Sequence, residues 1–152
     1  MKFIILLFFL FFACSEKSMD LQSNDKNNLI KVFDENLKIH QLLFKDDKVI
    51  PKLTSLITVT DKTLFKNQDL ISRIILLEQN LKSIDSKNRE SFITGYSHFS
   101  KELTGVIKQF GLKDKYTHFY CPMVDKTWVS TGYKIENPYA PDMRDCGEII
   151  QE

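Results

Sequence analysis

The chain has 152 residues, enough for one domain with its own core, and 43% of them are hydrophobic. Its 21 Lys and Arg residues face 20 Asp and Glu residues, so the formal net charge is +1. This balance, with no basic stripe, argues against a nucleic-acid partner, and the hydrophobic content excludes a disordered chain.

The N-terminus predicts an exported, lipid-anchored protein. Lys2 precedes an uninterrupted apolar run that ends at Ala13 and is about half as long as the ~20 residues that cross a bilayer. The stretch "LFFAC", which ends at Cys14, resembles a bacterial lipoprotein lipobox. We therefore expect residues 1–13 to be a signal peptide, and Cys14 to carry the acyl chains that hold the protein on a bacterial membrane, facing the periplasm or the cell exterior. An ordinary signal peptide with an incidental cysteine is the alternative.

The next part of the chain predicts a tether followed by helices. Residues 14–28 are polar without periodicity, as expected of a flexible tether. Between residues 29 and 111 apolar side chains recur every three or four positions, which is the spacing of amphipathic helices. The stripes predict four helices, over about 29–44, 51–64, 70–84 and 86–110, with Pro51 in the first turn of the second and Gly111 ending the fourth. Short connections between them favour an all-α fold, an up-down four-helix bundle.

Residues 112–152 differ in character, being rich in proline, glycine and aromatic residues. "TWVS" and "YKIENPY", on either side of Thr131-Gly132, predict a β-hairpin within a loop-rich extension packed on the bundle. We expect three aromatic side chains to pack this extension onto the helices: Trp128, Tyr133 and Tyr139. Asn137 is expected to bond local backbone in a turn.

Four sulfur-bearing residues are concentrated in the extension, as two short pairs: Cys121 with Met123, and Met143 with Cys146. Thiolates and thioethers are soft ligands, which select Cu(I) rather than zinc or hard cations, and His118 is a further candidate ligand. The two cysteines could instead form a disulfide, because an exported chain meets an oxidising environment, with the methionines filling gaps in the packing. The spacing alone leaves both interpretations open.

The extension also resembles the tail of a bacterial domain family of formally unknown function that is associated with copper resistance and heavy-metal efflux. The similar segments are "CPM" at 121–123, Trp128, "NPY" at 137–139 and "MRDCGE" at 143–148, together with Arg89 and Phe92 in the fourth predicted helix. The resemblance implies a site for Cu(I), Ag(I) or another soft ion, formed by Cys121, Met123, Met143 and Cys146 with His118. It also implies sequestration of the ion or its delivery to an efflux or metallochaperone partner. A structural or protein-interaction module with a Cys121–Cys146 disulfide is the alternative.

The remaining polar residues carry no pattern of an enzyme. The sequence lacks a serine-hydrolase order, a phosphate-binding glycine loop and an H-E-x-x-H or C-x-x-C motif, so we expect no catalytic residues. His40 lies on the apolar stripe of the first predicted helix and is expected to be a hydrogen-bonded residue at the edge of the core. His98 falls off the stripe of the fourth and is expected to be solvated.

Overall fold

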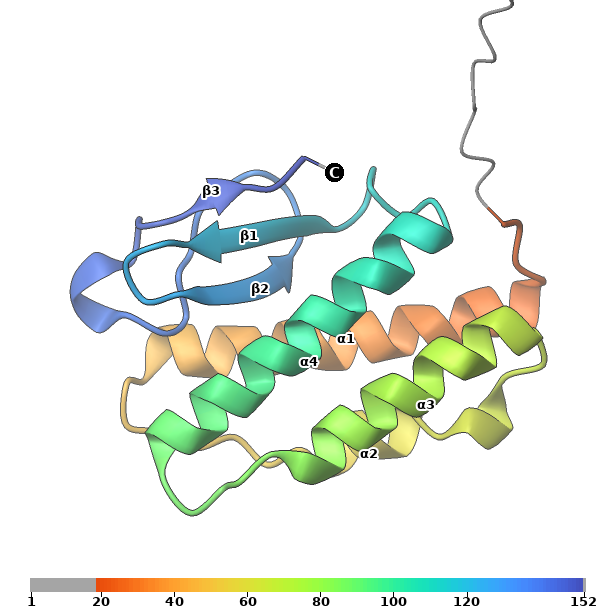
Figure 1. The fold of residues 1–152 in the computed structure, drawn as a ribbon, viewed down its shortest axis with the longest axis horizontal. Helices are drawn as coiled ribbons and strands as arrows, with labels where there is room; N and C mark the ends of the chain where they lie inside the picture. Colours follow the sequence, from red (N-terminus) through yellow and green to blue (C-terminus); the bar gives the residue numbers. More distant parts are fainter. Residues whose placement is uncertain (1–18, 152) are drawn as a thin grey trace, which may run out of the picture.

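The computed structural model describes residues 19–151 (Figure 1). In this range the chain forms four α-helices and three β-strands: α1 (Ser23–Lys45), α2 (Thr54–Val59), α3 (Gln68–Ser83), α4 (Arg89–Gln109), β1 (Thr117–Cys121), β2 (Lys126–Ser130) and β3 (Glu148–Ile149). Two 3-10 segments, η1 (Lys62–Leu64) and η2 (Pro141–Met143), complete it. The predicted signal peptide 1–13 and the lipidation site Cys14 lie outside the described residues. The first helix begins at Ser23, within the predicted tether.

The prediction of an all-α four-helix bundle is wrong, because the protein is an α+β domain. Its strands form one antiparallel sheet in the order β2-β1-β3. The sheet supplies a large part of the core, since Phe119, Trp128 and Val129 are as buried as the apolar residues of the helices. The C-terminal region is therefore integral to the domain and not an extension laid on a finished bundle.

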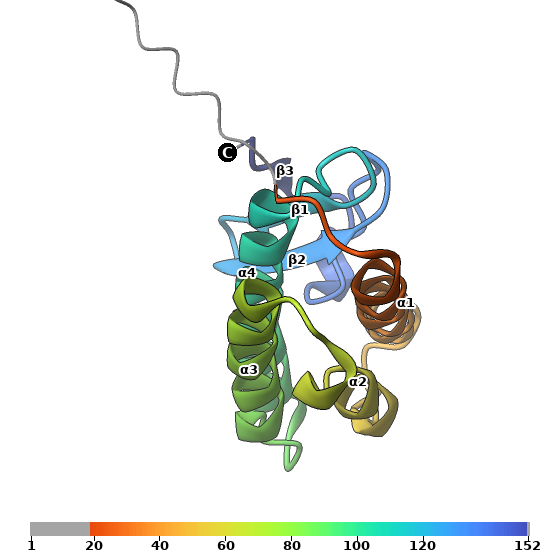
Figure 2. The same ribbon diagram turned by 90° about the vertical axis from the view of Figure 1, so that its right-hand side faces the viewer.

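The helices pack as two pairs beside the sheet. Figure 2 shows α3 and α4 as one layer and α1 and α2 as the neighbouring layer, with the sheet across one side of both. The strand nearest the helices is β2, which contacts α4 and α1. Because α2 is only six residues long, it cannot serve as a full fourth helix of a bundle.

Local capping explains where α3 and α4 begin. The side chains of Asn67 and Asn88 accept hydrogen bonds from backbone N–H groups in the first turns of α3 and α4. Gly111 has φ 64°, which confirms the predicted left-handed residue after the fourth helix. The second predicted helix is interrupted: Pro51 precedes α2, and Asp61 starts the separate η1 segment by accepting a hydrogen bond from Thr63 N.

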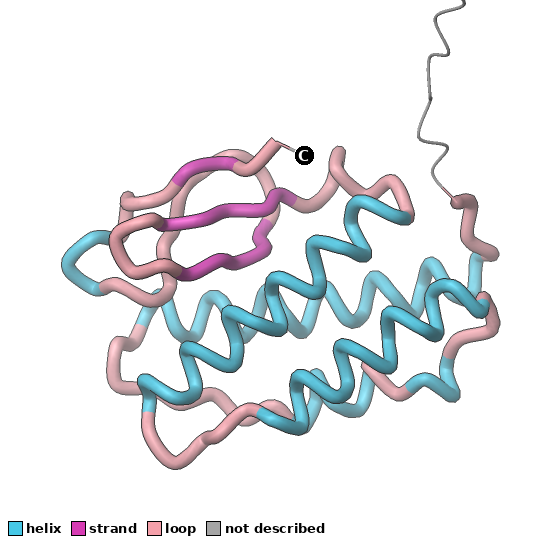
Figure 3. Tube along the Cα trace, viewed as in Figure 1, coloured by secondary structure: helices cyan, strands magenta, loops and turns pink. Residues whose placement is uncertain are grey.

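The observed hairpin is one strand earlier in the chain than predicted. "TWVS" does form most of β2, but it pairs with β1, in a register that places Phe119 opposite Trp128. The turn between these strands contains Asp125 at φ 49°, whose carboxylate accepts a 2.9 Å hydrogen bond from the Tyr120 hydroxyl. "YKIENPY" belongs to a segment without strands, residues 131–147, here called the C-terminal loop (Figure 3).

A buried polar network joins the sheet to both helix pairs. The side-chain amide of Asn36 in α1 donates to the Val129 carbonyl of β2 at 3.1 Å. The Asn36 side-chain oxygen accepts from the Tyr96 hydroxyl of α4 at 2.7 Å. All three residues are fully buried, so these bonds fix the position of β2 between the helices.

Within residues 19–151, none of the helices combines the length and the apolar character that a membrane crossing would require.

Candidate functional site: the Cys121–Cys146 disulfide and the C-terminal loop

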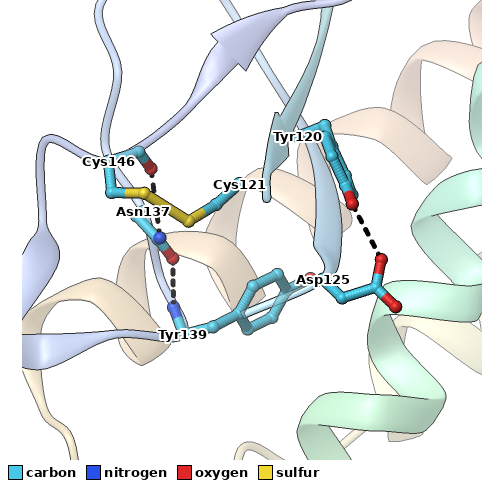
Figure 4. The surroundings of a disulfide bond; sticks show 6 residues. All are labelled: Tyr120, Cys121, Asp125, Asn137, Tyr139 and Cys146. Atoms are coloured by element: carbon cyan, nitrogen blue, oxygen red, sulfur yellow. Dashed lines mark hydrogen bonds between the residues drawn. A yellow bond between two sulfur atoms is a disulfide. The ribbon is translucent and has the colours of Figure 1, made fainter. Parts of the chain in front are cut away.

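The two cysteines of the described chain are joined in a disulfide (Figure 4). Cys121 is the last residue of β1, and Cys146 lies just before β3. Because β3 pairs antiparallel with β1, with Tyr120 opposite Glu148, the last residue of β1 lies beside the residues that precede β3. Their Cα atoms are 5.8 Å apart, within the usual range for a disulfide.

Asn137 organises the C-terminal loop around this bond. Its side chain is fully buried, donates to the Cys146 carbonyl at 3.1 Å and accepts from Tyr139 N at 2.9 Å. Its backbone N–H donates to the Arg144 carbonyl at 2.8 Å. These bonds confirm the predicted local role of Asn137 and close the loop on itself (Figure 4).

Aromatic side chains pack the C-terminal loop against the sheet. Trp128 stacks on Phe119 at 5.4 Å and meets the Tyr139 ring edge-on at 6.2 Å. The Tyr139 hydroxyl donates to the Thr127 carbonyl at 2.9 Å, and burial raises the Tyr139 pKa well above its usual value. Trp128 and Tyr139 are therefore packing residues, as predicted. Tyr133 is not, because 76% of it is exposed.

The loop also contacts the end of α1. The His40 ring nitrogen Nε2 donates to the Glu136 carbonyl at 2.8 Å, and burial lowers the His40 pKa. The Arg144 guanidinium lies over the Phe44 ring at 4.9 Å and donates to the Asn137 carbonyl at 3.0 Å. His40 is thus a buried, hydrogen-bonded residue as predicted, whereas His98 is exposed.

The structure brings together some of the predicted metal ligands and separates others. Met143 ends η2, and its carbonyl accepts from Cys146 N at 3.0 Å, so these two residues share one turn. Met123 lies in the β1–β2 turn and is 71% exposed. His118 is three positions before Cys121 in β1, so its side chain projects from the opposite face of the strand. The His118 ring forms a hydrogen bond with the Thr127 hydroxyl.

In this structure the five predicted ligands are not gathered at one point, and the soft-metal site stays a prediction. The sulfurs of Cys121 and Cys146 are bonded to each other, and a disulfide offers no thiolate to a metal. His118 lies across the strand from them. If the disulfide is reduced, a smaller ligand set stays compatible with a soft ion. This set consists of the two cysteine thiolates and the nearby Met143.

Two features of this region were missed at the sequence level. The first is β1, although the alternation of Thr117, Phe119 and Cys121 with more polar residues is a usable strand signal. The second is the environment of Arg89 in α4, whose Nε and Nη2 atoms are buried and have no hydrogen-bond partner among residues 19–151. The motif that contains Arg89 gives no sign of this environment, because the lack of a partner arises only in the folded chain.

Fold and site together define a disulfide-bonded α+β domain. No family model, no curated protein and no solved structure matches this chain.

Proposed function

We propose that the protein is an exported, lipid-anchored structural or protein-interaction module that presents the C-terminal loop in one fixed conformation. The observation that carries the proposal is the Cys121–Cys146 bond, which ties the end of the loop to β1. A loop held in place before binding loses less conformational entropy when a partner docks, and loops on a rigid scaffold are common binding surfaces.

Export is supported by two independent features. The charged residue, short apolar run and Cys14 at the N-terminus have the order of a lipoprotein signal. A structural disulfide persists in oxidising compartments and is rare in a reducing cytosol. Replacement of Cys14 with serine is expected to abolish labelling by radioactive palmitate in cells. Labelling that persists in this variant would contradict the anchor.

The disulfide is tested by intact-mass analysis of the protein purified from its natural compartment. Alkylation of Cys121 and Cys146 is expected only after reduction, because the Cys121 side chain is fully buried and bonded. Full alkylation of both thiols without a reductant would remove the basis of the proposal.

The interaction is tested by site-specific photo-cross-linking in intact cells. A photoreactive residue at Tyr133, 76% exposed in the C-terminal loop, should form an adduct with a second protein. The same group at Leu64, which is 41% exposed in η1 and outside the C-terminal loop, is the matched control. Cys121→Ala with Cys146→Ala should weaken the adduct at Tyr133. Equal adducts at both positions, or none at either, would contradict the proposal.

Binding of Cu(I) or Ag(I) by the reduced protein is a second candidate function. It is supported by the 5.8 Å separation of the two cysteine Cα atoms and by the turn that joins Met143 to Cys146. Two thiolates with a thioether form a soft ligand set, and the ion would be sequestered or passed to an efflux partner.

A Cu(I) titration under reducing conditions separates the two candidates. Cys121→Ser with Cys146→Ser should abolish tight binding, and Met143→Leu should weaken it, whereas Met123→Leu should leave it unchanged because Met123 is exposed in another turn. Unchanged affinity in the double cysteine variant would eliminate the copper candidate.

A further inference from the structure

The first described residues are fixed to the end of α4. The Met19 N–H donates to the Gln109 carbonyl at 3.3 Å, and Met19 and Leu21 are partly buried against the core. Figure 2 shows this start of the described chain beside the C-terminal end of α4, at the opposite end of the molecule from the connection between α3 and α4. The chain is therefore part of the folded domain from Met19 onward, and residues 15–18 alone separate it from Cys14.

This short separation limits how the domain can lie on a membrane. From Cys14 to Met19 a fully extended chain spans at most about 18 Å. The 21 residues of α4 span about 30 Å, so the connection at its far end is farther from Met19 than this chain can reach. When Cys14 is acylated, the C-terminal end of α4 is therefore held near the bilayer, and the molecule cannot turn over.

The surface at this end carries more exposed cations than exposed carboxylates. Among the exposed side chains of residues 19–26 and 108–115, the cationic ones are Lys26, Lys108, Lys113 and Lys115, and the acidic ones are Asp20 and Asp114. Asp25 is buried in the first turn of α1 and accepts hydrogen bonds from the backbone N–H groups of residues 66 and 67. Lysines close to a bilayer are attracted by anionic headgroups, so this surface suits a negatively charged membrane.

We propose that the surface formed by residues 19–26 and 108–115, here called the anchor face, lies on an anionic bilayer. This inference rests on the acylation of Cys14, which is part of the proposed function. The short chain from Cys14 brings the anchor face to the membrane, and its lysines select lipids with a net negative headgroup, such as phosphatidylglycerol. Acyl chains alone hold a protein on a bilayer of any charge, so a dependence on lipid charge comes from the anchor face.

The test is photo-cross-linking of the acylated full chain, purified and reconstituted into vesicles of phosphatidylcholine with phosphatidylglycerol. A photoreactive residue at Lys113 should form lipid adducts several times more often than the same group at Lys87. Lys87 is the matched control, because it is an exposed lysine in the connection between α3 and α4. Equal yields of lipid adduct at the two positions, or none at Lys113, would overturn the anchor face.

Paired charge variants test the class of lipid. With the photoreactive residue at Lys113, Lys108→Gln with Lys115→Gln should remove most of the increase in adducts that phosphatidylglycerol gives over phosphatidylcholine alone. Lys52→Gln with Lys82→Gln removes the same charge from exposed positions outside the anchor face and should leave the increase unchanged. An adduct yield that does not depend on phosphatidylglycerol, or an equal loss in both variants, would overturn the assignment of an anionic lipid.

An insertion tests the restriction imposed by the chain between Cys14 and the domain. About twelve Gly and Ser residues inserted before Met19 should reduce the difference between Lys113 and Lys87 in phosphatidylcholine vesicles, because the longer chain lets the domain turn. An undiminished difference would show that the short separation does not set the orientation.

Failure of the anchor face is distinguishable from failure of the proposed anchor. Intact-mass analysis reports acyl chains on the protein, and sedimentation with the vesicles reports whether they hold it there. A chain without acyl groups would overturn both proposals. An acylated, vesicle-bound chain that forms no lipid adducts at Lys113 would overturn the anchor face alone.

Discussion

At the scale of single residues, Gly147 shows how closely the chain approaches its own core after the disulfide. A Cβ atom at this position would lie 2.7 Å from Cη2 of Trp128 and 3.1 Å from Cγ2 of Ile135. Trp128 is fully buried between Phe119 and Tyr139, so its ring cannot move aside easily. The glycine is therefore required by packing and not by an unusual backbone angle.

Gly147→Ala is expected to lower the free energy of unfolding by about 1–3 kcal/mol, because the new methyl group overpacks the Trp128 site. Gly105→Ala is the matched control. Its Cβ would meet only the flexible end of Arg73, and alanine favours the α4 helix. Urea denaturation should show a loss for the first variant and none for the second. Similar losses in both would contradict the packing explanation.

His40 makes stability depend on pH. Burial lowers its pKa in the folded protein below the ordinary value of 6.5, so the unfolded chain binds the proton more readily. The contribution of His40 is fully present above about pH 6.5 and is lost as the pH falls toward the folded pKa. Wild type should therefore lose more stability than His40→Gln between pH 7.5 and 5.5, as measured by urea denaturation. Equal losses would show that His40 is not the group responsible.

At the scale of elements, β2 is the part that links the two helix pairs. The Asn36 side chain donates a hydrogen bond to the Val129 carbonyl of β2. The Ser97 hydroxyl of α4 accepts one from the Thr127 N–H of the same strand at 2.9 Å. These side chains satisfy backbone groups of an edge strand that would otherwise be buried without partners. The helices therefore complete the hydrogen bonding of the sheet as well as its hydrophobic packing.

Asn36→Ala should destabilise the protein by about 1–3 kcal/mol, because the buried Val129 carbonyl loses its side-chain donor and the Tyr96 hydroxyl keeps only the backbone carbonyl of residue 36 as acceptor. Asn80→Ala is the control. Asn80 makes one exposed hydrogen bond, to the Leu76 carbonyl in the same helix, so its loss should cost about 0.5 kcal/mol or less. Comparable losses from the two variants in thermal unfolding would refute a special role for the network.

At the scale of the whole molecule, the disulfide compensates for the small amount of regular structure near the C-terminus. The C-terminal loop follows β2 without a strand of its own, and β3 has only two residues. The bond between Cys121 and Cys146 closes a ring with a sequence separation of 25 and so restricts the unfolded chain.

Cys121→Ala with Cys146→Ala is expected to lower the free energy of unfolding by about 3 kcal/mol, from the loop entropy of a ring of this size. Hydrogen exchange should report the greatest loss of protection at β3 and the C-terminal loop, while α3 and α4 retain theirs until global unfolding. A loss of stability below about 1 kcal/mol would mean that packing of Trp128 and Tyr139 holds the loop without the covalent bond.

Much of the helical part of the fold was predictable because it rests on local rules. Apolar residues such as Leu70, Ile74 and Leu77 recur at helical spacing and do lie in the core. Gly111 ends α4 as its type predicts. The second predicted helix failed because Asp61 caps a new turn, a local competition that a hydrophobic stripe does not register.

The sequence by itself therefore determined the long helices α1, α3 and α4, the turn residue Asn137 and the presence of two thiols in one chain region. Only the tertiary structure decided that β2 pairs with β1 and that His118 and Cys121 project from opposite sides of that strand. It also decided that the buried Nε and Nη2 atoms of Arg89 find no hydrogen-bond partner within residues 19–151. A helix is stabilised by backbone hydrogen bonds between residues four apart, so its pattern is visible in a short stretch of sequence. Strand pairing and the contact of Cys121 with Cys146 depend instead on residues that are far apart in the sequence.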